Sequence, residues 1–153
     1  MYVPPVRPLC IGRDRQYKYD LLMEDAYKVE PNIREKLSDN FYRDEMQCQC
    51  GCGAGDISMD LIGRLQEVRD ALGEPMRIVS GIRCNSHNSK VGGTAGSSHL
   101  EGNGTAVDIA CDNSAYRQKI LRAIMPVFVR VGIAKTFIHC DVDATKSANV
   151  WLY

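Results

Sequence analysis

SSHLEGNGTAVDI, at residues 97–109, and FIHCD, at residues 137–141, contain two of the three histidines of this chain. These stretches supply His99, Asp108 and His139, and this combination of imidazole and carboxylate ligands suits a zinc ion. Three protein ligands leave a fourth coordination position for water, as in catalytic zinc sites, whereas structural sites are usually closed by four ligands. Taken singly, each residue would more readily be interpreted as an ordinary hydrogen-bonded group. Their combination predicts a catalytic metal site.

The expected strands support this grouping, because residues two apart in a strand share one face of the sheet. A strand at residues 136–142 carries His139 and Asp141 on one face, toward a cleft. Its opposite face is apolar and should pack in the core, with Ile138, Cys140 and Val142. A strand at residues 105–110 places Asp108 on the same face as two alanines, whose small side chains leave room for a metal.

A helix is predicted from a cap at Asp56 to Leu72, where apolar residues recur at three- and four-residue steps. The stripe consists of Ile57, Leu61, Leu65, Val68 and Leu72. Gly73 and Pro75 follow the stripe, and such residues are typical of a helix end.

The rest of the chain predicts a small sheet with further helices. We expect a strand at residues 76–80, a long functional loop at residues 81–104, and a helix from Asn113 to about Val131 that Pro126 kinks or splits. The terminal residues 151–153 should close the sheet edge or the core. The fold class is therefore α+β, with a small antiparallel sheet and flanking helices.

The chain of 153 residues predicts one compact domain at residues 46–153, preceded by a polar N-terminal arm at residues 1–45. Within the arm we expect one short helix around Asn32 to Asp39. Nineteen basic and nineteen acidic residues cancel, so no overall charge points to nucleic acid or to an anionic membrane. Apolar stretches such as residues 123–129 are too short to span a bilayer, so we expect no membrane insertion. We expect a monomer.

Seven cysteines, an odd number, combined with an N-terminus (MYVPPVRPLC) that lacks an apolar signal core, predict a protein made in a reducing compartment without an export signal. Three of the cysteines alternate in CQCGC, at residues 48–52. With Cys84 they could form a second, closed zinc site. The alternative is a glycine-rich turn with one or two buried thiols, and we favour it because one residue between cysteines is shorter than the usual zinc-ligand spacing. His87 is expected to organise its loop.

Several motifs in order resemble the M15 peptidases, the zinc D-alanyl-D-alanine carboxypeptidase family. They are SGIRCNSHN-x3-GG at residues 80–93, S-x-H-x2-G at 97–102, A-x-D at 106–108 and FIHCD at 137–141. The resemblance covers roughly residues 48–153 and implies a hedgehog-like peptidase fold. It also implies that His99, Asp108 and His139 bind zinc, and that Arg83 binds a carboxylate of the substrate, which suits the guanidinium fork.

The chain departs from the family pattern in two places. The segment between His99 and Asp108 is two residues longer than usual, and its glycines and asparagine are suited to a turn that would leave both ligands in place. No Glu, Asp or His lies in the few residues before His139, so we expect Asp141 to act as the general base. Ser97 is expected to contact the substrate or the metal.

The resemblance predicts a zinc-dependent hydrolase of peptidoglycan stem peptides, either a D-Ala-D-Ala carboxypeptidase or a murein endopeptidase. Its substrate lies outside the cytoplasmic membrane, so a phage lysis enzyme (an endolysin) or a virion enzyme would reconcile that location with the missing export signal. Two alternatives share the fold. One is a zinc-binding interaction module, as in hedgehog proteins, and the other is a structural virion component that has lost turnover.

Overall fold

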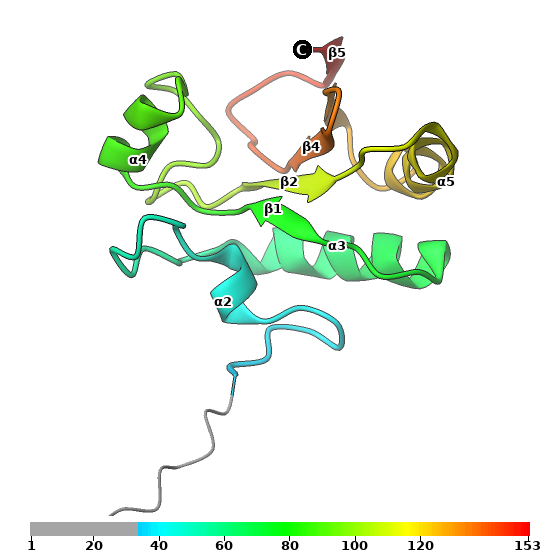
Figure 1. Ribbon diagram of the computed structural model, residues 1–153, viewed down its shortest axis with the longest axis horizontal. Coiled ribbons are helices and arrows are strands. Elements are labelled where there is room, and N and C mark those ends of the chain that lie inside the picture. Colours follow the sequence, from blue (N-terminus) through cyan, green and yellow to red (C-terminus); the bar gives the residue numbers. More distant parts are fainter. Residues whose placement is uncertain (1–33) are drawn as a thin grey trace, which may run out of the picture. The chain divides into compact units, whose positions relative to one another are not determined.

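The computed structural model describes residues 34–153, and Figure 1 shows this part as an α+β unit, as predicted. The helices are α2 (Arg43–Met46), α3 (Met59–Leu72), α4 (Asn85–Lys90) and α5 (Ser114–Ile124). The strands are β1 (Ile78–Ser80), β2 (Ala106–Ala110), β3 (Arg130–Ile133), β4 (Phe137–Asp141) and β5 (Asn149–Leu152). No helix among the described residues is long and apolar enough to cross a membrane.

The five strands form one sheet in the order β1-β2-β4-β3-β5. The first three pairings are antiparallel, as expected, but β3 and β5 run parallel, so the sheet is mixed. The terminal residues therefore form the sheet edge, which was one of the two predicted roles. The parallel pairing requires β5 to return beside β3 through the connection after β4, and no local sequence pattern specifies such a return.

Helix α3 follows the predicted apolar stripe, with Leu61, Leu65 and Val68 fully buried. Its N-cap is Ser58 and not Asp56, because the amide of Ser58 donates to the carbonyl of Gly104 (2.8 Å) and holds the preceding residues extended. The helix ends at Gly73, which adopts a left-handed conformation with φ of 67°.

The predicted helix from Asn113 to about Val131 was wrong in its second half. Asn113 caps α5 as expected, its side chain accepting from the amide of Tyr116, but α5 ends at Ile124. Pro126 lacks the amide hydrogen that would continue the helical hydrogen bonding, although Met125 before it keeps a helical backbone. The chain then enters β3, where Val131 is fully buried between β4 and β5.

The long loop at residues 81–104 contains α4, which the sequence did not predict. This helix (NSHNSK) has no apolar stripe, and its buried side chain is a polar one, Asn88, whose amide donates to the carbonyl of Thr94 (2.9 Å). The short helix expected around Asn32 to Asp39 is also not found in its described part, residues 34–39, where Lys36 forms an isolated bridge with Tyr42.

The core lies where α3 runs along the sheet, and Figure 1 shows α4 and α5 beyond opposite ends of the central strands. Phe41 and Met46 pack into the same core, so ordered structure precedes the boundary expected at residue 46. Most of the predicted arm lies outside the described residues, and the boundary stays a prediction. On β4 the predicted faces are confirmed, because Ile138 and Cys140 are fully buried in the core.

Gly132, in the middle of β3, provides a test of how the sheet edge packs. A Cβ at this position would lie 2.7 Å from the rings of Trp151 and Tyr153. We expect Gly132→Ala to destabilise the protein by about 1–3 kcal/mol through overpacking. Gly63→Ala, in α3 where nothing lies within 4 Å, should instead stabilise it by about 0.5–1 kcal/mol. Urea unfolding of both variants measures this, and equal effects would contradict the packing described here.

Candidate metal centre

The three predicted ligands meet at one point in the structure. Asp108 on β2 and His139 on β4 are direct partners in the antiparallel ladder, and His99 lies in the loop before β2. His139 Nδ1 lies 2.9 Å from Asp108 Oδ1, and His99 Nε2 lies 3.1 Å from His139 Nδ1 and 3.2 Å from Asp108 Oδ1. All three residues are at least 95% buried.

Hydrogen bonds on the far side of each imidazole fix which nitrogen faces this point. His99 Nδ1 donates to the carbonyl of Gly81 (2.7 Å), and His139 Nε2 donates to Asp141 Oδ2 (3.0 Å). In the neutral tautomers set by these bonds, His99 Nε2, His139 Nδ1 and Asp108 Oδ1 are all acceptors. Three acceptor atoms about 3 Å apart repel each other unless a cation lies between them.

The spacing of the three acceptor atoms also fits zinc. Zinc bonds of about 2.0–2.1 Å in tetrahedral geometry place neighbouring ligand atoms roughly 3.4 Å apart. The observed separations of 2.9–3.2 Å are close to this value. Burial alone would lower the pKa of His139, but the carboxylates of Asp108 and Asp141 raise it, because this cluster attracts positive charge. The donor set and its spacing therefore suit a zinc ion.

The longer segment between His99 and Asp108 forms the expected turn, and His99 Nε2 still lies close to Asp108 Oδ1. Gly102 and Gly104 adopt positive φ angles of 89° and 57°. The amides of Asn103 and Gly104 both donate to the carbonyl of Leu100 (3.0 and 3.1 Å). A Cβ on Gly104 would lie 2.2 Å from the carbonyl oxygen of Asp56, so the turn packs closely against the segment before α3.

Arg83 holds the outer oxygen of Asp108. Its Nη2 donates to Asp108 Oδ2 (2.6 Å) and its Nε donates to Ser80 Oγ (2.9 Å). Burial alone would raise the pKa of Asp108, but the neighbouring His139 and His99 bring it well below its usual range. Asp108 is therefore ionised, with one oxygen on Arg83 and the other facing the histidines. Arg83 lines the cavity. Its Nε and Nη2 groups make the bonds described above, and its Nη1 group has no hydrogen bond to another described residue.

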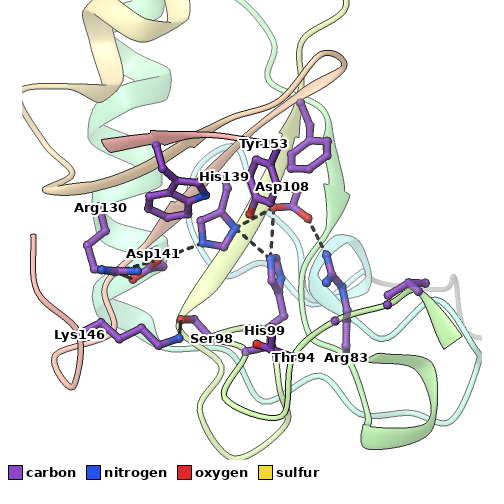
Figure 2. A pocket seen from close by; sticks show the side chains of 16 residues that line it. Arg83, Thr94, Ser98, His99, Asp108, Arg130, His139, Asp141, Lys146 and Tyr153 are labelled. Carbon is purple, nitrogen blue, oxygen red and sulfur yellow. Dashed lines mark hydrogen bonds and ion pairs between the residues drawn. The ribbon is translucent and has the colours of Figure 1, made fainter. Parts of the chain in front are cut away.

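Asp141 holds His139 from the other side, and this contact was not predicted from the sequence. Its carboxylate accepts from His139 Nε2, from Arg130 Nε (2.8 and 3.1 Å) and from the amide of Asp143 (3.1 Å). Burial would raise the pKa of Asp141, but these donors, His139 first, lower it. Figure 2 shows the resulting row of interactions from Arg83 through Asp108, the histidines and Asp141 to Arg130.

These residues line a cavity of about 600 Å³. One part of its wall is aromatic, with the Trp151 ring centred 5.4 Å from that of His139 and the Phe137 ring 5.3 Å from that of Tyr153. Arg130 also lines the cavity, and sequence reasoning missed it because β3 was taken for the end of a helix. Residues 151–153 were expected to close the sheet edge or the core, but nothing local indicated that Trp151 and Tyr153 line the cavity.

A second polar group fastens the loop that carries His99. Asp143 accepts from Ser98 Oγ (2.8 Å), from the hydroxyl and amide of Thr145 (2.6 and 3.0 Å) and from Lys146. Lys146 also donates to Ser98 Oγ (2.7 Å) (Figure 2). Ser97, predicted to contact the substrate or the metal, lines the cavity and accepts from the amide of His99 (3.3 Å). Lys146 and Ser98 had no signal in the sequence.

A family model described as Peptidase M15 matches residues 39–141 of the chain. No curated protein matches the chain. The matched range contains every residue of the site described above apart from Asp143, Thr145, Lys146 and the terminal aromatic residues.

Asp143 gives a prediction about acid stability. Burial would raise the pKa of Asp143, but its hydrogen bonds, first from Thr145, lower it well below the usual 3.8. A lowered pKa stabilises the folded state above the unfolded pKa, and this contribution is lost as the pH falls through the folded value. Asp143→Asn should therefore cost roughly 1–3 kcal/mol at neutral pH. The difference from wild type should shrink progressively below about pH 4.

Urea unfolding of both proteins from neutral to acidic pH measures this difference. Asp112→Asn, at an exposed residue after β2, is the matched control and should have little effect at any pH. If the difference in unfolding free energy between wild type and Asp143→Asn stayed constant down to acidic pH, the lowered pKa of Asp143 would be contradicted.

Proposed function

Because the chain belongs to the M15 peptidase family, we propose that His99, Asp108 and His139 hold its zinc ion and that it cleaves peptidoglycan stem peptides. Membership of this family makes the chain a zinc metallopeptidase of the peptidoglycan-acting kind. The ligand assignment and the particular substrate are the proposal.

The observation that carries the proposal is the meeting of three acceptor atoms at the cavity wall. His99 Nε2, His139 Nδ1 and Asp108 Oδ1 face one another with no donor between them, each oriented by a bond on its far side. Three protein ligands beside an open cavity leave a coordination position for water and substrate. A closed structural site would have no reason to line a cavity.

The chemistry divides between the ion and the residues around it. A zinc ion bound here supplies the Lewis acid that polarises a carbonyl and lowers the pKa of a coordinated water toward about 7. Arg83 fixes the orientation of Asp108, and Asp141 fixes the tautomer and ring position of His139, as carboxylates beside metal-binding histidines do.

Asp141 is better suited to this positioning role than to that of the general base. Three donor groups, His139 Nε2, Arg130 Nε and the amide of Asp143, occupy its carboxylate oxygens, and its pKa is lowered rather than raised toward neutrality. A general base works best with a pKa near the working pH and with a free oxygen near the proton it accepts. We therefore assign Asp141 the role of orienting His139 and not that of the general base.

A stem peptide offers carboxylates to the cations of the cavity. Arg83, Arg130 and Lys146 line it, and each also pairs with a carboxylate of the protein. Arg83 is the first candidate for the substrate carboxylate, because its Nη1 is not bonded to another described residue and a guanidinium binds carboxylates well. Ser97 lies beside His99 and could hydrogen-bond to the peptide. The cleaved bond is either the D-Ala-D-Ala bond or an internal murein bond. The biological role that we propose is that of a phage lysis enzyme or a virion enzyme.

The first test measures zinc content and cleavage on the same preparations. Relative to wild type, His139→Ala and Asp108→Asn should each lose one zinc per chain, because each removes a ligand. Cleavage of a synthetic stem pentapeptide and of purified murein should fall by roughly 10³-fold or more, since the ion supplies several kcal/mol of transition-state stabilisation. The products, separated by chromatography, identify the bond that is cut.

Asp112→Asn, at the exposed residue after β2, is the control for Asp108→Asn and should retain both zinc and activity. The substrate assignment would be overturned if His139→Ala loses its zinc as expected but the wild-type protein cleaves no murein peptide. Full zinc retention in both ligand variants would overturn the ligand assignment.

Asp141→Asn tests the positioning role. If Asp141 orients His139, zinc affinity should fall about 10- to 100-fold, and kcat should recover when zinc is added to saturation. A competitive chelator titration gives the affinity, and kcat and KM are measured against added zinc. A general base would give a different result. In that case the zinc affinity would be unchanged, kcat would stay low at all zinc concentrations, and the acidic limb of the pH profile would be lost.

A further inference from the structure

A second group of metal-binding side chains lies outside the cavity. Cys48, Cys50 and Cys52 lie in the loop between α2 and α3, and Cys84 is the N-cap of α4. The Sγ atoms of all four lie within 4.8 Å of one another. Cys50 Sγ is 3.4 Å from Cys48 Sγ and 3.6 Å from Cys84 Sγ, and none of the four thiols is in a disulfide.

The backbone of residues 48–54 brings the three alternating cysteines together. In an extended strand, side chains two residues apart are separated by nearly 7 Å along the chain. Here Gly51 and Gly53 adopt positive φ angles of 79° and 84°, and the amide of Cys48 donates to the carbonyl of Ala54 (2.7 Å). The segment therefore curls into a closed loop around the thiols, which explains how a spacing of one residue suffices.

The separations of the sulfur atoms suit a tetrahedral zinc ion. Zn–S bonds of about 2.3 Å place neighbouring sulfurs roughly 3.8 Å apart. Amide groups also point at the sulfurs, since Cys84 N donates to Cys48 Sγ and His87 N donates to Cys84 Sγ (both 3.4 Å). His87 Nδ1 lies 3.2 Å from Cys48 Sγ. Such hydrogen bonds support thiolate ligands in metal sites.

We propose that Cys48, Cys50, Cys52 and Cys84 bind a second zinc ion in a closed, structural site. Four protein ligands leave no open position, and none of these residues lines the cavity. The interpretation favoured from the sequence, a turn with buried thiols, does not account for two thiols that are exposed and still converge with the other two. Thiolates are soft ligands, and a four-cysteine set is typical of structural zinc.

The site joins the loop after α2 to the segment that supports the catalytic centre. Next to it, the amide of Ile82 donates to the carbonyl of Met46 (2.8 Å), and a Cβ on Gly81 would lie 2.5 Å from that carbonyl oxygen. Cys84 directly follows Arg83, whose backbone pairs with His99 and whose side chain holds Asp108. The second ion would thus fix residues 81–84, on which two of the three catalytic ligands depend.

The test counts metal in the full-length protein purified without chelators. We expect two zinc ions per chain in wild type, one in His139→Ala, one in Cys50→Ser and two in Cys111→Ala, a control thiol buried outside the cluster. After substitution with cobalt, wild type and His139→Ala should both show an intense sulfur-to-cobalt charge-transfer absorption. Cys50→Ser should show a much weaker one.

The inference does not depend on the zinc at His99, Asp108 and His139, so the two can fail separately. A single zinc in wild type that disappears in His139→Ala would overturn the second site and leave the first intact. Iron in place of zinc would overturn the choice of metal. If Cys50→Ser does not fold, the cobalt spectrum of His139→Ala still tests the cysteine site. A His139→Ala spectrum without sulfur-to-cobalt absorption overturns the proposal.

Discussion

The pairing of Asp108 with His139 across β2 and β4 is the constraint on which the rest of the site depends. The two residues are direct partners in the antiparallel ladder, so their side chains emerge together on the cavity face. The same register buries Ile138 and Cys140 on the opposite face. A slip of one residue would move the ligands into the core and these apolar side chains into the cavity. Burial of the apolar face therefore fixes the placement of Asp108 and His139.

Around this pair the structure balances a row of buried charges. Each carboxylate lies between an imidazole and an arginine, Asp108 with Arg83 and Asp141 with Arg130. Removing one member of such a row leaves an unpaired buried charge, which is more costly than the intact pair is favourable. The arrangement also orients both carboxylates, because each uses separate oxygens or lone pairs for its histidine and for its arginine. These outer partners therefore orient His99, Asp108 and His139 toward a common point.

The segment at residues 81–84 connects the two candidate metal sites. Gly81 accepts the outer hydrogen bond of His99, Arg83 holds Asp108, and Cys84 belongs to the thiol cluster. Because this segment has only a three-residue strand, β1, before it and a six-residue helix, α4, after it, little regular structure holds it. A structural ion at this position would supply rigidity that such short elements cannot.

The sequence alone indicated the grouping of His99, Asp108 and His139, the family, the α3 stripe and the two faces of β4. The stripe and the faces are periodic patterns within one segment, and the grouping and the family follow from short motifs in a fixed order. Only the tertiary structure decided the mixed sheet, the end of α5, the role of Arg130 and Asp141 around the histidines, and the convergence of Cys84 with the CQCGC loop. Each of these depends on segments far apart in the chain: β3 is a strand because β4 and β5 flank it, and Cys84 reaches the loop because residues 46 and 82 pair. Such long-range pairings arise from the burial of shared surfaces, which no single segment of sequence encodes.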